Sequence, residues 1–250
     1  MKNIRWDSVF AAVTLCFGIG IICYAVSRID SEYITSFAET DSVVYVNAPA
    51  DDETVIVLDA GHGGMDGGCS SAEGIPEKGI NLNIMLAVRD MAQIFGYETV
   101  TTRDCDMSIH DDGVEGIRAQ KISDMENRLE LFNKYPKSVC ISIHQNTYTD
   151  PQFKGAQMFY SAANPESSRL ASSLQTLFKE NLQPYNDRET KLCGSELYLC
   201  HFCNSPAVMA ECGFLSNPEE ASLLTDEQYQ QKTAFTIFEG INEFLGSRSS

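Results

Sequence analysis

Two kinds of apolar pattern alternate along the chain from residue 54 onward. Short, nearly continuous apolar runs predict buried strands, and longer segments with apolar residues three or four positions apart predict amphipathic helices. This alternation predicts a single α/β domain of three layers, in which helices cover both faces of a central, mostly parallel, twisted sheet of about six strands. The predicted strands span residues 54–60, 97–103, 138–144, 155–161, 195–200 and 206–214. The predicted helices span residues 81–95, 119–135, 164–182 and 226–245.

The N-terminal segment has a different pattern. Residues 9–26 form an uncharged, apolar run that follows the basic residues Lys2 and Arg5. As a helix this run would be about 27 Å long, close to the roughly 30 Å hydrocarbon core of a bilayer. We therefore predict that residues 1–28 are an N-terminal membrane anchor or an uncleaved signal, which places the domain outside the cytoplasm. The alternative is secretion after cleavage near Ser27.

The rest of the chain divides by composition. Residues 29–53 are polar and lack periodicity, which predicts a stalk before the α/β domain at 54–246 and a short tail at 247–250. With 35 acidic and 18 basic residues, the chain has a formal net charge of −17. Such a chain repels the phosphates of nucleic acids, so we expect no nucleic-acid partner.

Two histidines stand at the ends of predicted strands. His62 follows the first strand within a glycine-rich bend, and His144 ends the strand 138–144. The carboxyl ends of parallel strands meet at one edge of a sheet, where α/β proteins bind their ligands, so we expect the two imidazoles to face one another. The alternative is that each histidine only caps its own strand.

Carboxylates lie near both histidines along the predicted fold. Glu77 precedes the first predicted helix, and Glu73 in the same loop is its rival. Glu211 lies inside an apolar strand, where burying a carboxylate costs free energy unless a partner is present. Two imidazoles, one carboxylate and an open fourth position form the ligand set of hydrolytic zinc sites, so a divalent cation is the expected partner.

From about residue 54 to 245, the chain resembles the zinc-dependent N-acetylmuramoyl-L-alanine amidases that act on bacterial cell walls. The stretches that carry this resemblance occur in the family's order along nearly the whole domain. With a single predicted anchor and no wall-binding repeats, the chain is most similar to the spore-cortex amidases of endospore formers. The matching stretches are LDAGHGGMDGG, PEKGINLNI, TR at 102–103, NRLELFN, SIHQN, FKGAQMFY and PAVMAECGFLSNPEE.

The resemblance implies a role for each candidate residue. It implies that residues 54–246 are a catalytic domain with one zinc ion per chain, bound by His62, Glu77 and His144. Glu211 would be the catalytic acid and base. The chain departs from the family at Gln145 and Cys212, which stand where the family usually has small or aliphatic residues, and both are neighbours of the expected site.

Further residues are candidates for contacts with the substrate, which the resemblance implies is the glycan strand and stem peptide of peptidoglycan. These candidates are Asn146, Arg103 and Arg128, although pairing with nearby acidic residues explains the arginines equally well. The implied reaction is hydrolysis of the amide between the lactyl group of N-acetylmuramic acid and L-alanine, in maturation of the spore cortex and its muramic lactam. The sequence leaves open whether an accessory protein is a further partner.

Two alternative functions remain open on the sequence. The first is an inactive wall-binding or regulatory protein that keeps the same scaffold. The second is a zinc peptidase that cuts within the stem peptide. In each case the protein would act in the cell envelope, outside the cytoplasm.

Overall fold

The computed structural model describes residues 54–247. The predicted anchor at 1–28 and the predicted stalk at 29–53 lie outside the described residues, as does the end of the predicted tail. Between residues 54 and 247, none of the helices is both long enough and apolar enough to traverse a lipid bilayer.

Six strands form one sheet in the described part of the chain, in the order β2-β1-β3-β6-β4-β5. Every neighbouring pair is parallel except β4 with β6, which is antiparallel. The prediction of a mostly parallel sheet of six strands is therefore confirmed. The strands are β1 (Val55–Ala60), β2 (Glu98–Thr101), β3 (Ser138–Asn146), β4 (Gln157–Tyr160), β5 (Lys191–Leu192) and β6 (Ala207–Phe214).

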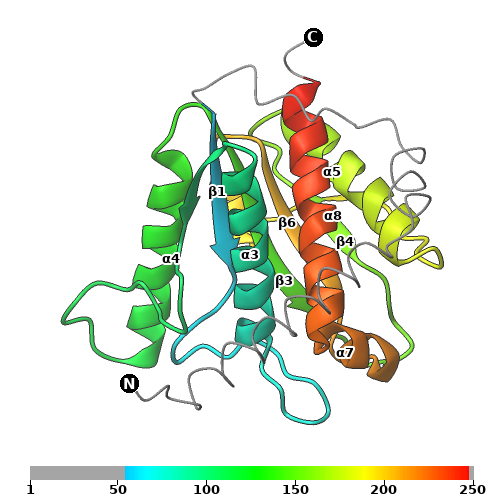
Figure 1. Cartoon of the computed structure of the whole chain (residues 1–250). Coiled ribbons are helices and arrows are strands. Elements are labelled where there is room, and N and C mark those ends of the chain that lie inside the picture. Colours follow the sequence, from blue (N-terminus) through cyan, green and yellow to red (C-terminus); the bar gives the residue numbers. More distant parts are fainter. Residues whose placement is uncertain (1–53, 248–250) are drawn as a thin grey trace, which may run out of the picture. The chain divides into compact units, whose positions relative to one another are not determined.

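Helices connect these strands and cover the sheet. Figure 1 shows α3 and α8 lying across the central strands, with α4 and α5 toward the two sides. The helices are α3 (Glu77–Ile94), α4 (Ile117–Asn133), α5 (Glu166–Leu177) with the π-helical turn η1 (Phe178–Leu182), α6 (Tyr198–Phe202), α7 (Pro218–Leu224) and α8 (Glu227–Gly246).

The alternation of side chains along β1 explains the three layers. Ile56 and Leu58 belong to a large apolar core that also contains buried residues of α3, α5 and α8. Val55 and Val57 point to the opposite face, where they join a second core with Phe132 of α4 and residues of α6. Because both faces of β1 are covered, each of its residues is buried, which accounts for its continuous apolar run.

One predicted strand is wrong. The segment 195–200 contains the start of the short helix α6, and the sixth strand of the sheet is β5, two residues long and exposed. The apolar residues Leu199 and Cys200 are buried as successive residues of a helical turn. A short apolar run fits a buried strand and a buried helix equally well, so its periodicity could not distinguish them.

A buried ion pair joins β1 to α4. Arg128 and Asp59 are 1% and 0% exposed, and the distance between Nη1 and Oδ1 is 2.6 Å. Arg128 also pairs with Asp124, at 2.7 Å, and donates hydrogen bonds to the carbonyl oxygens of Ala60 and His62. The arginine therefore fixes the backbone at the point where β1 ends.

Replacing Arg128 by methionine tests this buried pair. The change leaves the Asp59 carboxylate buried without its cation, so we expect the free energy of unfolding to fall by about 3–5 kcal/mol. Urea denaturation measures the loss. The control is Arg89→Met on α3, whose partner Asp90 is exposed, with an expected loss of at most about 1 kcal/mol. Equal losses in the two variants would contradict the assigned importance of the Asp59–Arg128 pair.

Candidate active site

The carboxyl ends of β1, β3 and β6 bring two histidines and a glutamate to one place. His144 of β3 lies opposite Glu211 of β6 in the parallel register, so the two side chains leave the sheet on the same face. His62 lies two residues beyond the end of β1, and its ring centroid is 4.9 Å from that of His144. The expectation that the two imidazoles face one another is met.

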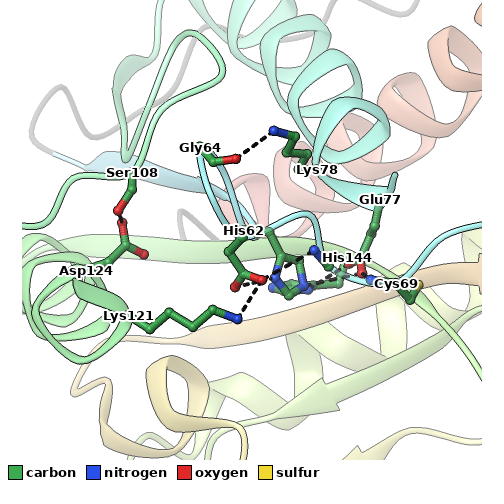
Figure 2. Close-up of polar contacts among 12 residues, drawn as sticks. His62, Gly64, Cys69, Glu77, Lys78, Ser108, Lys121, Asp124 and His144 are labelled. Atoms are coloured by element: carbon green, nitrogen blue, oxygen red, sulfur yellow. Dashed lines mark hydrogen bonds and ion pairs between the residues drawn. The ribbon is translucent and has the colours of Figure 1, made fainter. Parts of the chain in front are cut away.

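Glu77 lies between the two imidazoles. It is the first residue of α3 and only 2% exposed. Its Oε1 atom is 3.0 Å from Nδ1 of His144, and its Oε2 atom is 3.3 Å from Nε2 of His62. The carboxylate also accepts hydrogen bonds from the backbone amides of Cys69 and Gln145. Figure 2 shows the three side chains directed toward one another.

These three residues have the geometry of a metal site. One ligand atom from each of His62, Glu77 and His144 lies within 4.8 Å of the others, and no other group of His, Cys, Asp or Glu between residues 54 and 247 meets this condition. The rival Glu73 is exposed in the preceding loop. Two imidazole nitrogens and a carboxylate oxygen suit Zn²⁺ and leave a fourth position open.

The electrostatics of the cluster favour a cation. Burial by itself would lower the pKa of His62, but hydrogen bonds to Glu77 and Asp66, with their charges, raise this pKa to about 9. Burial would raise the pKa of Glu77, yet hydrogen bonds from His144 and His62 hold this pKa well below its usual value. The buried carboxylate therefore stays ionised and stabilises positive charge at the site.

Asp66 orients the first histidine. Its Oδ2 atom is 2.9 Å from Nδ1 of His62, and its Oδ1 atom is 2.8 Å from Nζ of Lys121. A partner at Nδ1 directs Nε2 toward Glu77, as carboxylate partners do for histidines that bind metals. Asp66 was not among the residues predicted from the sequence, although it lies in the same glycine-rich stretch, four residues after His62.

Glu211 has a buried oxygen atom with no partner. Its Oε2 atom makes no hydrogen bond with any residue of the described domain. Burial raises the pKa of Glu211 to about 7, although the histidines His144 and His62 oppose the rise. An unpaired buried carboxylate oxygen is rare and costly in a folded protein. Beside the His–Glu–His cluster, this oxygen is placed to exchange a proton with a group held at the open ligand position.

A cleft of about 310 Å³ opens over these residues. Its floor is the sheet edge that carries the histidines and Glu211, and its walls come from α4 and from the segment that begins α6. The wall formed by the segment that begins α6 was not predicted from the sequence, because a strand was predicted at 195–200. Residues that line the cleft include His62, His144, Glu211, Lys121, Met125 and Tyr198.

Comparisons with known proteins agree with this geometry. The family model of N-acetylmuramoyl-L-alanine amidases matches residues 56–243, which is most of the chain. The chain belongs to the N-acetylmuramoyl-L-alanine amidase family. It is 35% identical over 191 residues to the germination-specific N-acetylmuramoyl-L-alanine amidase of Bacillus subtilis (strain 168), a match that covers 76% of this chain and 79% of the relative.

Two further relatives extend the comparison of this amidase. AmiA of Escherichia coli (strain K12), an N-acetylmuramoyl-L-alanine amidase, is 26% identical over 234 residues, with 76% of each chain covered. The solved structure of the CwlD amidase from Clostridioides difficile in complex with the GerS lipoprotein superposes with a TM-score of 0.74. That match has 36% sequence identity and covers 77% of this chain and 98% of the solved one.

Arg103, one of the predicted substrate contacts, is not among the described residues that line the cleft of the amidase. Arg103 is 3% exposed and donates hydrogen bonds to the carbonyl oxygens of Ala60, Gly61, Cys105 and Lys78. The guanidinium group of Arg103 is thus occupied by the backbone around the His–Glu–His cluster, and its contact with the substrate stays a prediction.

Of the two other predicted contacts, Arg128 lines the cleft and Asn146 does not. The side-chain oxygen of Asn146 accepts a hydrogen bond from the backbone amide of Thr147, and Asn146 is not among the described residues that line the cleft. The guanidinium group of Arg128 reaches the edge of the cleft but is held in the buried pair with Asp59. For Arg128, pairing with acidic residues is the explanation that the structure supports.

Gly61 lies against the ring of His144. A Cβ atom at residue 61 would overlap Cε1 and Nε2 of this imidazole. Because Gly61 has no side chain, the ring of His144 can lie directly against the backbone at the end of β1. A larger residue at position 61 would force the ring to move. The glycine before His62 is needed for space as much as for the bend.

Substituting Gly61 by alanine should displace the His144 ring while leaving the fold intact. Because misplacing a reacting group by about 1 Å costs on the order of a hundredfold in rate, we expect a loss of about this size in release of soluble fragments from purified peptidoglycan. The control is Gly79→Ala in the first turn of α3, where an added Cβ meets nothing within 4 Å. A Gly61→Ala protein as active as Gly79→Ala would show that the ring tolerates the methyl group.

Proposed function

We propose that this amidase is a zinc hydrolase that cleaves the amide bond between the lactyl group of N-acetylmuramic acid and L-alanine of the stem peptide. The observation that carries the proposal is the unpaired, buried Oε2 atom of Glu211 beside the cluster of His62, Glu77 and His144. The cluster alone would hold an ion, and the neighbouring carboxylate supplies the proton transfer that hydrolysis requires.

In this proposal His62, Glu77 and His144 hold one zinc ion per chain. When bound, zinc lowers the pKa of a water molecule toward 7 and polarises the carbonyl group of the amide. Asp66 keeps His62 in the orientation that directs Nε2 inward. The buried Glu77 carboxylate, ionised between the two imidazoles, neutralises one of the two positive charges of the ion.

Glu211 moves the proton. Its Oε2 atom accepts a proton from the attacking water and delivers it to the nitrogen of the departing L-alanine. A pKa near 7 suits both steps, because the group must gain and lose the proton in each cycle. The burial that raises this pKa also keeps bulk water from the unpaired oxygen.

We infer that the wall layer cut by this amidase is the spore cortex, where the reaction leads to muramic lactam. The similarity to the germination-specific amidase of Bacillus subtilis supports this role. The enzyme would act outside the cytoplasm in the cell envelope, held at the membrane by the apolar segment within residues 1–28. The CwlD amidase of Clostridioides difficile, solved in complex with the GerS lipoprotein, supports an accessory protein as a further partner.

Replacing the site residues separates metal binding from proton transfer. We expect Glu211→Gln to keep one zinc ion per chain and to lose turnover, and His144→Ala to lose both the ion and turnover. Elemental analysis and the release of muropeptide fragments measure the two effects. Glu73→Gln is the matched control, because Glu73 is the exposed carboxylate of the same loop. Wild-type rates in Glu211→Gln would refute the proton-transfer role.

The products of digestion identify the bond that is cut. An amidase frees stem peptides with an L-alanine N-terminus and leaves glycan with an unsubstituted lactyl group, and mass spectrometry resolves both. We expect these products from peptidoglycan treated with the zinc-loaded protein, with a preference for cortex over vegetative wall. Fragments cut within the stem would instead support the peptidase alternative, and undigested wall would support the inactive one.

A further inference from the structure

A groove of about 670 Å³ runs beside α4 and continues the cleft of the active site. Three residues line both hollows, namely Lys121 and Met125 of α4 and Tyr198 of α6. The other lining residues come from the first three turns of α4. The groove therefore adjoins the cleft, and it lies in the direction from the metal site toward the N-terminus of α4.

The groove is apolar where a solvent-facing helix would normally be polar. Ile117 and Ile122 are 66% and 51% exposed, and they flank Arg118 on the outer surface of α4. Together with Met125, these side chains present a strip of hydrocarbon along the helix. Such a strip is the kind of surface that binds alkyl groups of a ligand.

Two cations lie in the first turns of α4, where they oppose the electrostatics of the helix. The first turn holds no acidic residue, and no side chain caps the helix at Gly116. Arg118 and Lys121 add positive charge to the end of the helix that already carries the positive pole of its dipole. Arg118 forms no ion pair or hydrogen bond with another residue between 54 and 247. Asp66 offsets the charge of Lys121, whereas Arg118 is exposed and its charge is available to a bound anion.

We propose that this groove binds the stem peptide of the substrate, with Arg118 as the residue that recognises its free carboxylate groups. The proposal rests on the proposed function, which places the scissile amide at the site of His62, Glu77 and His144. From that amide the substrate extends in two directions, as peptide on one side and as glycan on the other. The groove takes the peptide.

The chemistry of the two branches decides this assignment. In the stem, D-glutamate is linked through its γ-carboxyl group, so its α-carboxylate remains free, and the following diamino acid adds a methylene chain and a further carboxylate. The glycan next to the scissile bond offers hydroxyl and acetamido groups, and its lactyl carboxyl is consumed in the amide. Two cations and one carboxylate, Glu126, line the groove beside the hydrocarbon strip. The cation without an ion pair, Arg118, matches the free carboxylates of the peptide and not the uncharged groups of the sugar.

Lys121 joins the groove to the metal site. Its ammonium group is 2.8 Å from Oδ1 of Asp66, the carboxylate that orients His62, and Figure 2 shows its side chain extending from α4 toward the histidines. A change at Lys121 would disturb the metal ligand as well as the groove. Arg118 has no such link, so it is the residue to vary.

The test compares two substrates cleaved by the zinc-loaded full chain, N-acetylmuramoyl-L-alanine and N-acetylmuramoyl-tripeptide. Losing a hydrogen bond to a charged group typically costs a factor of about ten or more. We therefore expect Arg118→Ala to raise KM for the tripeptide substrate about tenfold more than KM for the alanine substrate, with kcat changed less than KM. Arg118→Lys should restore part of the difference.

Matched controls lie on α3. Arg89→Ala removes an arginine that lines neither hollow, and Ile94→Ser removes an isoleucine that is 82% exposed, against Ile122→Ser in the groove. We expect the α3 variants to treat the two substrates as the wild type does. Equal effects of Arg118→Ala on both substrates, or no effect on either, would overturn the proposal. A loss that follows the length of the glycan would assign the groove to the sugar and overturn it as well.

A binding measurement separates this proposal from the proposed function. Isothermal titration calorimetry of the free tripeptide L-alanyl-γ-D-glutamyl-diaminopimelate is performed on the Glu211→Gln protein, and again with Arg118→Ala added. We expect the added change to weaken binding about tenfold. Binding that depends on Arg118 in a protein whose parent cleaves no muramoyl amide would refute the proposed function and retain the groove. Cleavage of the muramoyl amide without any dependence on Arg118 would retain the proposed function and refute the role of the groove.

Discussion

The buried pair of Asp59 and Arg128 is the constraint on which the active site depends. Asp59 is the penultimate residue of the fully buried strand β1, and its carboxylate also accepts hydrogen bonds from Thr102 and from Ser142 of β3. Arg128 holds the carbonyl oxygen of His62 at 2.7 Å. His62 has a φ of 63°, an unfavourable value for a residue with a side chain. The ion pair thus ties β1, β3 and α4 together and keeps this residue in the strained conformation that directs its ring toward Glu77.

Around this ion pair, the site contains buried carboxylates whose burial would cost free energy without the neighbouring groups. Glu77 is buried between two imidazoles, and its ionised carboxylate is held by the amides of Cys69 and Gln145. The Oε2 atom of Glu211 is buried without a partner. Proteins keep such costly groups where function requires them, and here the costs fall on residues that converge on one small volume. The costly buried carboxylates of the amidase therefore lie together at the carboxyl edge of its sheet. The large apolar core that the described residues form on the other face of the sheet contains no such group.

The segment from 194 to 203 shows where sequence patterns fail. Its apolar residues fit a strand as well as a helix, and only the packing of Leu199 and Cys203 against β1 and α4 selects the helical turn. The helical turn matters for the site, because it places Tyr198 in the lining of both the cleft and the groove. The role of Asp66 was missed, and the backbone contacts of Arg103 were not predicted, for a related reason. Their residue types allow many roles, and the role that each takes depends on neighbours distant in the chain.

The sequence by itself determined the α/β class, the mostly parallel sheet and the residues from which the site is assembled. These follow from local periodicity, from the rule that parallel strands align their carboxyl ends, and from residue types with few alternative uses. Only the tertiary structure decided that Asp66 orients His62, that Arg103 and Arg128 bind the backbone, and that Arg118 faces open solvent in a groove. These are properties of contacts between segments far apart in the chain, and burial and electrostatics at such contacts exist only after the chain has folded.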